Sequence, residues 1–252
     1  MKRRFNVTGS CNPRRHYMVR LDDRLKKIKE DYVDYGSYFV INRGRQYGKT
    51  TTLAALEEYL KDDYTVLSLD FQQMGTEDFA DAATFAHAFA AILIETLEIN
   101  GLGDREELMA PLAEVMNRDH NSLKDLFMRL SRMCRNSIQP IVLMIDEVDS
   151  ASNNQVFVDF LAQLRGYYLK RDKMPTFHSV ILAGVYSIKN LKLKLRPESE
   201  HQFNSPWNIA ADFKINMRFS AEQIAGMLGE YEADYQTGMD ICAVAEEIYA
   251  YT

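Results

Sequence analysis

The chain has 252 residues, of which 46% are hydrophobic, and it carries a formal net charge of -6 with a pI near 5.5. This length and composition can bury the core of one large α/β domain, alone or with a small lid. The acidic balance argues against a protein that coats nucleic acid, because backbone phosphates need concentrated positive charge, although a local basic patch stays open.

Three scattered cysteines without a Cys-x-x-Cys pair favour neither a disulfide framework nor zinc, and they indicate a reducing compartment. Polar residues interrupt the N-terminal stretch that a signal peptide would need, and no apolar run approaches the length of a membrane span. We therefore expect a cytoplasmic protein without a membrane partner.

Four short apolar runs predict strands, at residues 38–42, 65–71, 140–147 and 179–186. Long stretches with helical spacing separate the later runs, which is typical of parallel strands with crossover helices. The third and fourth runs are almost continuously hydrophobic, so we expect central strands buried on both faces. Two helices, near 81–99 and 121–136, are expected between the second and third strands, with a turn at Gly101 and Gly103. Further helices are predicted at 153–171, 220–235 and 239–252, and a long loop at 191–208.

Residues 43–50, which we call the phosphate loop, follow the first predicted strand and open a helix. A triphosphate needs converging backbone N–H groups, a cation on its β and γ phosphates and a hydroxyl that holds magnesium, and this context supplies all three. Lys49 is predicted to bridge the β and γ oxygens, Thr50 to ligate Mg²⁺ and Thr51 to contact the α phosphate. The full set predicted to bind ATP is Arg45, Gln46, Tyr47, Gly48, Lys49, Thr50 and Thr51.

The phosphate loop departs from the G-x-x-x-x-G-K-[ST] pattern at Arg43, where glycine is expected, and Gly44 lies one place late. Only positions with positive φ strongly demand glycine, so Arg43 is tolerable if the loop begins at ordinary φ. Gly-Lys-Ser/Thr alone arises by chance in about one chain of this length in ten, so a second element has to decide.

That second element is the sequence IVLMIDEVD, in which Asp146 and Glu147 close an apolar strand. Adjacent carboxylates at the end of a buried strand are costly without a cation or polar partner. We assign Asp146 to the magnesium shell, through water or Thr50, and Glu147 to the general base that activates the attacking water. The alternative is that both acids are exposed and merely begin a loop.

The fourth strand ends in GVYSIKN, where ATPases with a glutamate after the Walker B aspartate carry a polar residue that senses the γ phosphate. Ser187 is the catalytic candidate and Tyr186 the second choice, with an ordinary loop serine as the alternative. Charge for the transition state has three candidate sources, each with simple solvation as the alternative: Arg165, Arg196 and Arg218.

Several segments together resemble the bacterial AAA-like ATPase family, in the STAND and archaeal-ATPase branch of P-loop proteins. They are RRFNVTGSCNPRRHYMV, NRGRQYGKTTTL, IVLMIDEVD, SVILAGVYSIKNLK and SPWNIA. Such relatives often carry arginine in place of the first loop glycine. The resemblance implies a three-layer α/β P-loop core of the ASCE class, in which the acidic strand lies beside a fourth strand that neighbours the loop strand, with ATP and Mg²⁺ as ligands.

The resemblance also implies three parts of the chain. An N-terminal segment, 1–36, would pack near the nucleotide base around Tyr17 to Arg20. An ATPase core, 37–218, would follow, and then the start of a helical lid, 219–252. Relatives continue into a Gly-Tyr-Pro motif and often a further region, so we expect this lid to be partial. A homo-oligomer, an effector domain or a partner protein would then respond to the nucleotide.

Three functions compete for these residues. The first is an Mg-ATPase that acts as a nucleotide-dependent switch, and the second is a nucleotide-binding scaffold or DNA-associated module with little turnover. A small-molecule phosphotransferase ranks last. Such enzymes take a substrate hydroxyl as nucleophile, so they seldom need a glutamate directly after the Walker B aspartate, where this chain has Glu147.

Overall fold

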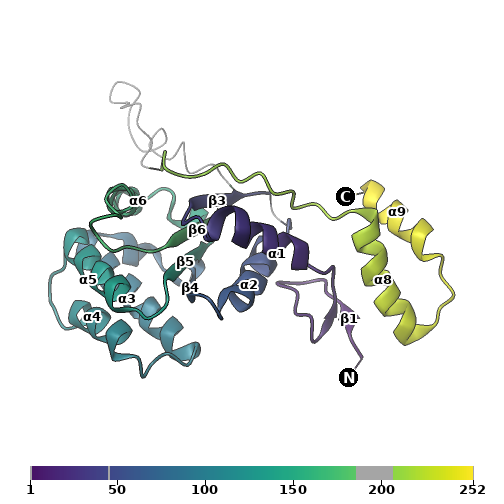
Figure 1. The fold of residues 1–252 in the computed structure, drawn as a ribbon, viewed down its shortest axis with the longest axis horizontal. Coiled ribbons are helices and arrows are strands. Elements are labelled where there is room, and N and C mark those ends of the chain that lie inside the picture. The colour runs from purple at the N-terminus through teal and green to yellow at the C-terminus, as the bar shows by residue number, and fades with distance from the viewer. Residues whose placement is uncertain (1, 45, 186–206, 252) are drawn as a thin grey trace.

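A computed structural model describes residues 2–44, 46–185 and 207–251. Its main sheet has four parallel strands: β3 (Tyr38–Asn42), β4 (Thr65–Asp70), β5 (Ile141–Asp146) and β6 (Ser179–Gly184). Their order is β3-β6-β5-β4 (Figure 1). The acidic strand β5 therefore lies beside β6, and β6 separates it from the loop strand β3, as the family resemblance implied. The predicted α/β class with a parallel sheet is confirmed.

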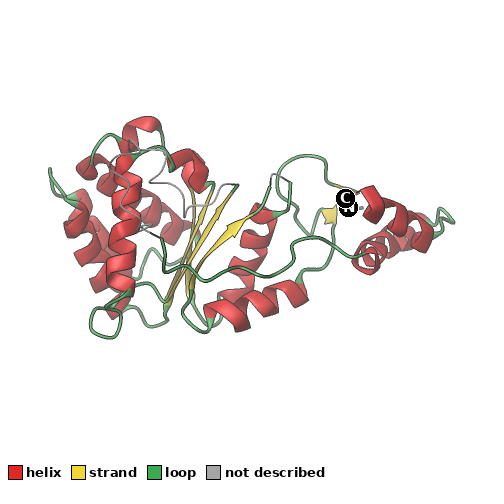
Figure 2. Cartoon of the chain, turned by 90° about the horizontal axis from the view of Figure 1, so that it is seen from above, coloured by secondary structure: helices red, strands yellow, loops and turns green. Residues whose placement is uncertain are grey.

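Helices cover both faces of this sheet, and Figure 2 shows the strands between the two layers. One layer holds α1 (Asp22–Ile28), a π-helical turn (Lys29–Val33) and α2 (Lys49–Leu60). The other holds α3 (Ala82–Ile99), α4 (Glu106–Met116), α5 (Leu123–Asn136) and α6 (Gln155–Tyr168). Short 3-10 turns lie at Phe71–Gln73, Thr76–Phe79 and Val148–Ala151.

Every residue of β5 and β6 is buried, as their continuous apolar sequence predicted. Alternate side chains enter different cores, because successive residues of a strand point to opposite faces. Leu143 and Ile145 pack with the α3 to α6 layer, whereas Val142 and Met144 pack with the α1 and α2 layer. The two central strands therefore contribute side chains to the cores on both faces of the sheet, and this packing determines where the C-terminal end of β5 lies.

Both helices predicted between β4 and β5 are present, as α3 and α5, but the prediction missed α4, which lies between them. Pro111 stands inside α4, and a proline in a helix interior removes a hydrogen bond and usually marks a break. Leu108, Leu112 and Val115 are nonetheless buried in the core on one side of this helix. Tertiary burial thus outweighs the local signal.

At the other end of the molecule, α8 (Ala221–Tyr235) and α9 (Ile241–Tyr251) form a hairpin with a small core of its own (Figure 1). Two short parallel strands, β1 (Arg4–Phe5) and β2 (His16–Tyr17), lie against α8. The predicted division at residues 36 and 218 stays a prediction. Of the predicted loop at 191–208, residues 191–206 lie outside the described residues.

One described helix, α3, is long and apolar enough to cross a membrane by length and composition alone. Phe85, Phe89 and Leu93 of α3 are fully buried in the core beside β4, a position that equally explains the apolar sequence. Core helices pass the same test, so α3 is weak evidence for a membrane span.

Candidate functional site

The phosphate loop connects β3 to α2 at the edge where the parallel strands end. Gly48 has φ 69°, in the left-handed region, and no atom lies within 4 Å of a Cβ built there. Backbone conformation, and not crowding, therefore favours glycine at this position. Gln46 also has positive φ, and Tyr47 is 38% exposed. Arg45 lies outside the described residues.

Arg43, the departure from the motif, is absent from the residues with positive φ. Its amide donates to the carbonyl of Gly184 at 3.2 Å, which continues the pairing of β3 with β6 by one residue. Arginine is therefore compatible with the backbone here, because the loop opens as an extension of a strand.

Lys49 is the first residue of α2, and only 6% of it is exposed. Its ammonium donates to the carbonyls of Arg43, at 3.0 Å, and Gly44, at 3.1 Å. The positive charge is thus held inside the curve of the phosphate loop, at the N-terminus of a helix. Backbone N–H groups and a cation at such a place favour an anion.

A hydrogen bond joins the phosphate loop to the acidic strand, because Thr50 Oγ1 donates to Asp146 Oδ2 at 2.6 Å. Asp146 is the last residue of β5 and is 6% exposed. Hard cations such as Mg²⁺ prefer oxygen ligands and usually keep several waters and substrate phosphates. The Thr50 hydroxyl and the Asp146 carboxylate are therefore suitable ligands for a magnesium ion that is also bound by water and phosphate. Among the described residues, no group of three or more His, Cys, Asp or Glu side chains that could hold a metal ion occurs.

Glu147 is half-buried and adopts φ 52°, a conformation that non-glycine residues rarely take. Its amide donates to Asp146 Oδ1 at 2.9 Å, so the two acids share one tight turn. Burial and then the negative charge of Asp146 raise the pKa of Glu147, and the nearby Lys49 ammonium partly offsets this. The fully exposed alternative is therefore wrong for Asp146 and does not describe Glu147.

The other predicted residues are placed as follows. Thr51 Oγ1 accepts the amide of Cys11 at 3.1 Å, so the N-terminal segment contacts α2 beside the loop. On α6, Arg165 donates to Asn208 at 2.7 Å, while Arg218 is exposed on the segment before α8. The remaining candidates lie outside the described residues: Ser187, Tyr186 and Arg196.

Sequence reasoning gave no role to Asp149, the last acid of IVLMIDEVD. Its carboxylate accepts the amide of Val185, directly after β6, and it lies against Gly184. Asp149 thus ties the turn that holds Glu147 to the end of the neighbouring strand. A third acid three residues after Asp146 is the signal that could have been used.

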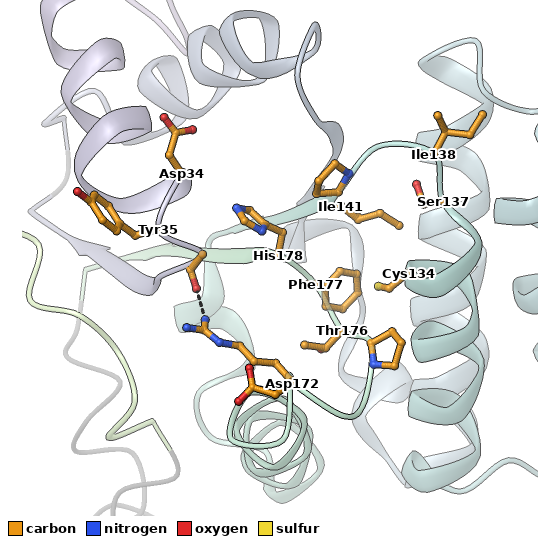
Figure 3. Close-up of a pocket in the computed structure, with 14 residues that line it drawn as sticks. Asp34, Tyr35, Cys134, Ser137, Ile138, Ile141, Asp172, Thr176, Phe177 and His178 are labelled. Atoms are coloured by element: carbon orange, nitrogen blue, oxygen red, sulfur yellow. Dashed lines mark hydrogen bonds between the residues drawn. The ribbon is translucent and has the colours of Figure 1, made fainter.

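A pocket of about 530 Å³ lies at the opposite edge of the sheet, where β5 and β6 begin (Figure 3). Two of the polar groups around it are bonded within the protein, because Arg171 donates to the carbonyl of Gly36 at 2.7 Å and His178 contacts the carbonyl of Val33 at 2.8 Å. Burial raises the pKa of the Cys134 thiol, which makes it a poor nucleophile. The phosphate loop, with its buried cation and its bond to the acidic strand, is therefore the better candidate for a functional site.

Comparison with known proteins bears on the family and the fold of the chain. The model of the AAA-like domain family matches residues 12–246, whereas no curated protein matches the sequence. The Walker-type ATPase PABY2304 of Pyrococcus abyssi has a similar structure, with a TM-score of 0.62 at 12% identity. The similarity covers 96% of this chain and 65% of that protein, so this chain spans about two thirds of its length.

A second similar structure is the Orc1 protein of Aeropyrum pernix in complex with DNA. Its TM-score is 0.48 at 12% identity, over 86% of this chain and 50% of that one. At such low identity, the similarity to the Pyrococcus protein shows a shared fold and no more.

Proposed function

Because the chain belongs to the AAA-like domain family, we propose that it binds ATP with Mg²⁺ and hydrolyses it as a nucleotide-dependent switch. The observation that carries this proposal is the 2.6 Å hydrogen bond between Thr50 and Asp146. It brings the phosphate loop and the acidic strand, 96 residues apart in sequence, to one point beside Glu147.

Binding is assigned to the backbone of the phosphate loop and to Lys49. The N–H groups at the start of α2 face the place where the triphosphate enters, and the Lys49 ammonium, with three donors, turns from the loop carbonyls to the phosphate oxygens. Thr50 and Asp146 would hold Mg²⁺, which neutralises charge on the β and γ phosphates when bound.

Glu147 is assigned the general base that orients the attacking water and accepts its proton. Burial and the charge of Asp146 raise the pKa of Glu147, which makes its carboxylate a stronger base than an ordinary glutamate. The hydrogen bond from the Glu147 amide to the Asp146 carboxylate keeps the proposed general base next to the residue assigned to magnesium.

The test measures binding of labelled ATP with Mg²⁺, and phosphate release, for the wild type and two variants. We expect Lys49→Ala to lose at least about tenfold in affinity, a cost expected when a charged contact is removed. Glu147→Gln should bind ATP but release no phosphate above background. The matched control is Lys61→Ala, at the exposed end of the same helix, which should behave as the wild type. Binding that ignores Lys49 would refute the site.

A scaffold that holds ATP without turnover is the second candidate function. Rapid hydrolysis needs an arginine on the transferred phosphate, which is worth several orders of magnitude in rate. In the described part of the chain, Arg165 is bonded to Asn208, and the Arg43 guanidinium is bonded to the backbone carbonyls of Asn42 and Ile215. ATP binding that depends on Lys49, with phosphate release equal in the wild type and Glu147→Gln, would establish the scaffold and exclude the switch driven by hydrolysis.

A further inference from the structure

The side chain of Arg43 leaves the phosphate loop and reaches a segment far away in sequence. That segment, residues 208–219, connects the core to α8, and we call it the strap. The Arg43 guanidinium lies 3.5 Å from the carbonyl oxygen of Phe213 and 3.4 Å from that of Ile215. The same group donates to the carbonyl of Asn42 at 2.9 Å and lies 5.7 Å from the centre of the Phe213 ring.

This arrangement uses properties that only arginine has among the cationic side chains. The guanidinium carries five N–H donors in a fixed plane, so it can bridge several carbonyls at once, whereas a lysine is a point charge. The same guanidinium nitrogen, Nη2, lies within 3.5 Å of the carbonyl oxygens of both Phe213 and Ile215, so these two carbonyls converge on Arg43. The residue that breaks the glycine pattern is therefore matched to the strap.

The strap is held to the core by contacts from other elements as well. The Ala211 amide donates to the carbonyl of Tyr38 at 2.8 Å, beside β3. The hydroxyl of Tyr32 donates to the carbonyl of Asp212 at 3.0 Å and accepts the amide of Lys214 at 2.9 Å. These anchors come from the sheet edge and the turn after α1, and Arg43 adds one from the phosphate loop itself.

Arg43 also contacts the residue assigned to the phosphates, because its backbone carbonyl accepts the Lys49 ammonium at 3.0 Å. When that ammonium donates to a triphosphate, the bond to the Arg43 carbonyl weakens. Resting on the function proposed above, we propose that Arg43 is a positioning residue that couples ATP binding to the strap and so to α8 and α9. A change in the position of the Lys49 ammonium alters its hydrogen bond to the Arg43 carbonyl, and the Arg43 side chain transmits this change to the carbonyls of the strap.

The test compares amide hydrogen exchange of the full chain with and without Mg-ATP, at saturation for each variant. The wild type should show ATP-dependent protection in the strap and α8. Arg43→Gly restores the glycine of the motif and removes the side chain from the strap, so at ATP saturation we expect the ATP-dependent protection of residues 208–235 to fall by more than half. Arg43→Lys keeps the charge without the planar fork and should resemble Arg43→Gly.

Tyr32→Phe is the control for a purely structural anchor. It removes a hydroxyl that holds the strap but does not touch the phosphate loop. Its strap should exchange faster without ligand, yet keep the wild-type response to ATP. Unchanged protection in Arg43→Gly, or an equal loss in Tyr32→Phe, would overturn the coupling alone. A wild type that binds no ATP would instead overturn the proposed function, and the coupling with it.

Discussion

Gly184→Ala should destabilise the core, because the last residue of β6 has no room for a methyl group. A Cβ at this position would lie 2.8 Å from Asp149 Oδ2 and 3.0 Å from Val148 Cγ2. Overpacking of this kind typically costs about 1–3 kcal/mol. In a chain of this length each kcal/mol lowers Tm by about 2–4 °C, so we expect a fall of about 2–12 °C.

Thermal unfolding followed by circular dichroism measures this shift, and Gly166→Ala is the matched control. Gly166 is exposed on α6 and a Cβ there meets no atom within 4 Å, so alanine should be neutral or stabilise by up to about 1 kcal/mol. Repeating Gly184→Ala in an Asp149→Ala background should recover at least about 0.5 kcal/mol, the lower range of coupling between touching residues. An equal cost in both backgrounds would refute the steric argument.

Three further predictions concern other parts of the chain. Tyr17→Phe removes the hydroxyl that donates to the Asp234 carboxylate at 2.6 Å, so limited proteolysis should cut between the core and α8 faster than in the wild type. Burial and the charge of Asp146 raise the pKa of Glu147. The rate of phosphate release at saturating ATP should therefore increase with pH, and the midpoint of this increase should lie above the ordinary glutamate pKa of about 4.3. Burial lowers the pKa of His178, and the fold therefore favours the neutral ring. The free energy of unfolding should fall as pH drops below about 6.5, and less steeply in His178→Gln, as measured by urea denaturation.

Sequence patterns predicted the central sheet because its strands are buried on both faces. IVLMID and SVILAG are continuous apolar runs that contain β-branched residues and are too short for a typical buried helix, so they favour buried strands. The missed helix α4 had the opposite balance, since Pro111 argued locally for a break while Leu108, Leu112 and Val115 supplied the burial that overcame it. That compensation depends on α3 and α5, which no local pattern contains.

The candidate site divides in the same way between local and distant information. The phosphate loop and the acid pair are contiguous motifs, so the sequence was sufficient to propose them. The contact of Cys11 with Thr51 and that of Arg43 with Ile215 join residues 40 and 172 positions apart. Such pairs leave no spacing signal, and only the packed chain reveals that the N-terminal segment and the strap both reach the phosphate loop.

Backbone conformation explains which motif positions tolerate substitution and where strain collects. Gly48 adopts φ 69° and needs glycine, while Arg43 extends β3 and does not. Among the described residues, Gln46, Glu147 and Gln236 have positive φ without being glycine, and the first two flank the proposed ATP site. Such conformations cost about 1–3 kcal/mol each and persist only where the surroundings hold them. Two hydrogen bonds hold Glu147 in this conformation. Its amide donates to Asp146 Oδ1 at 2.9 Å, and its carbonyl accepts the amide of Ser150 at 3.0 Å. These bonds keep the proposed base in place before any ligand binds.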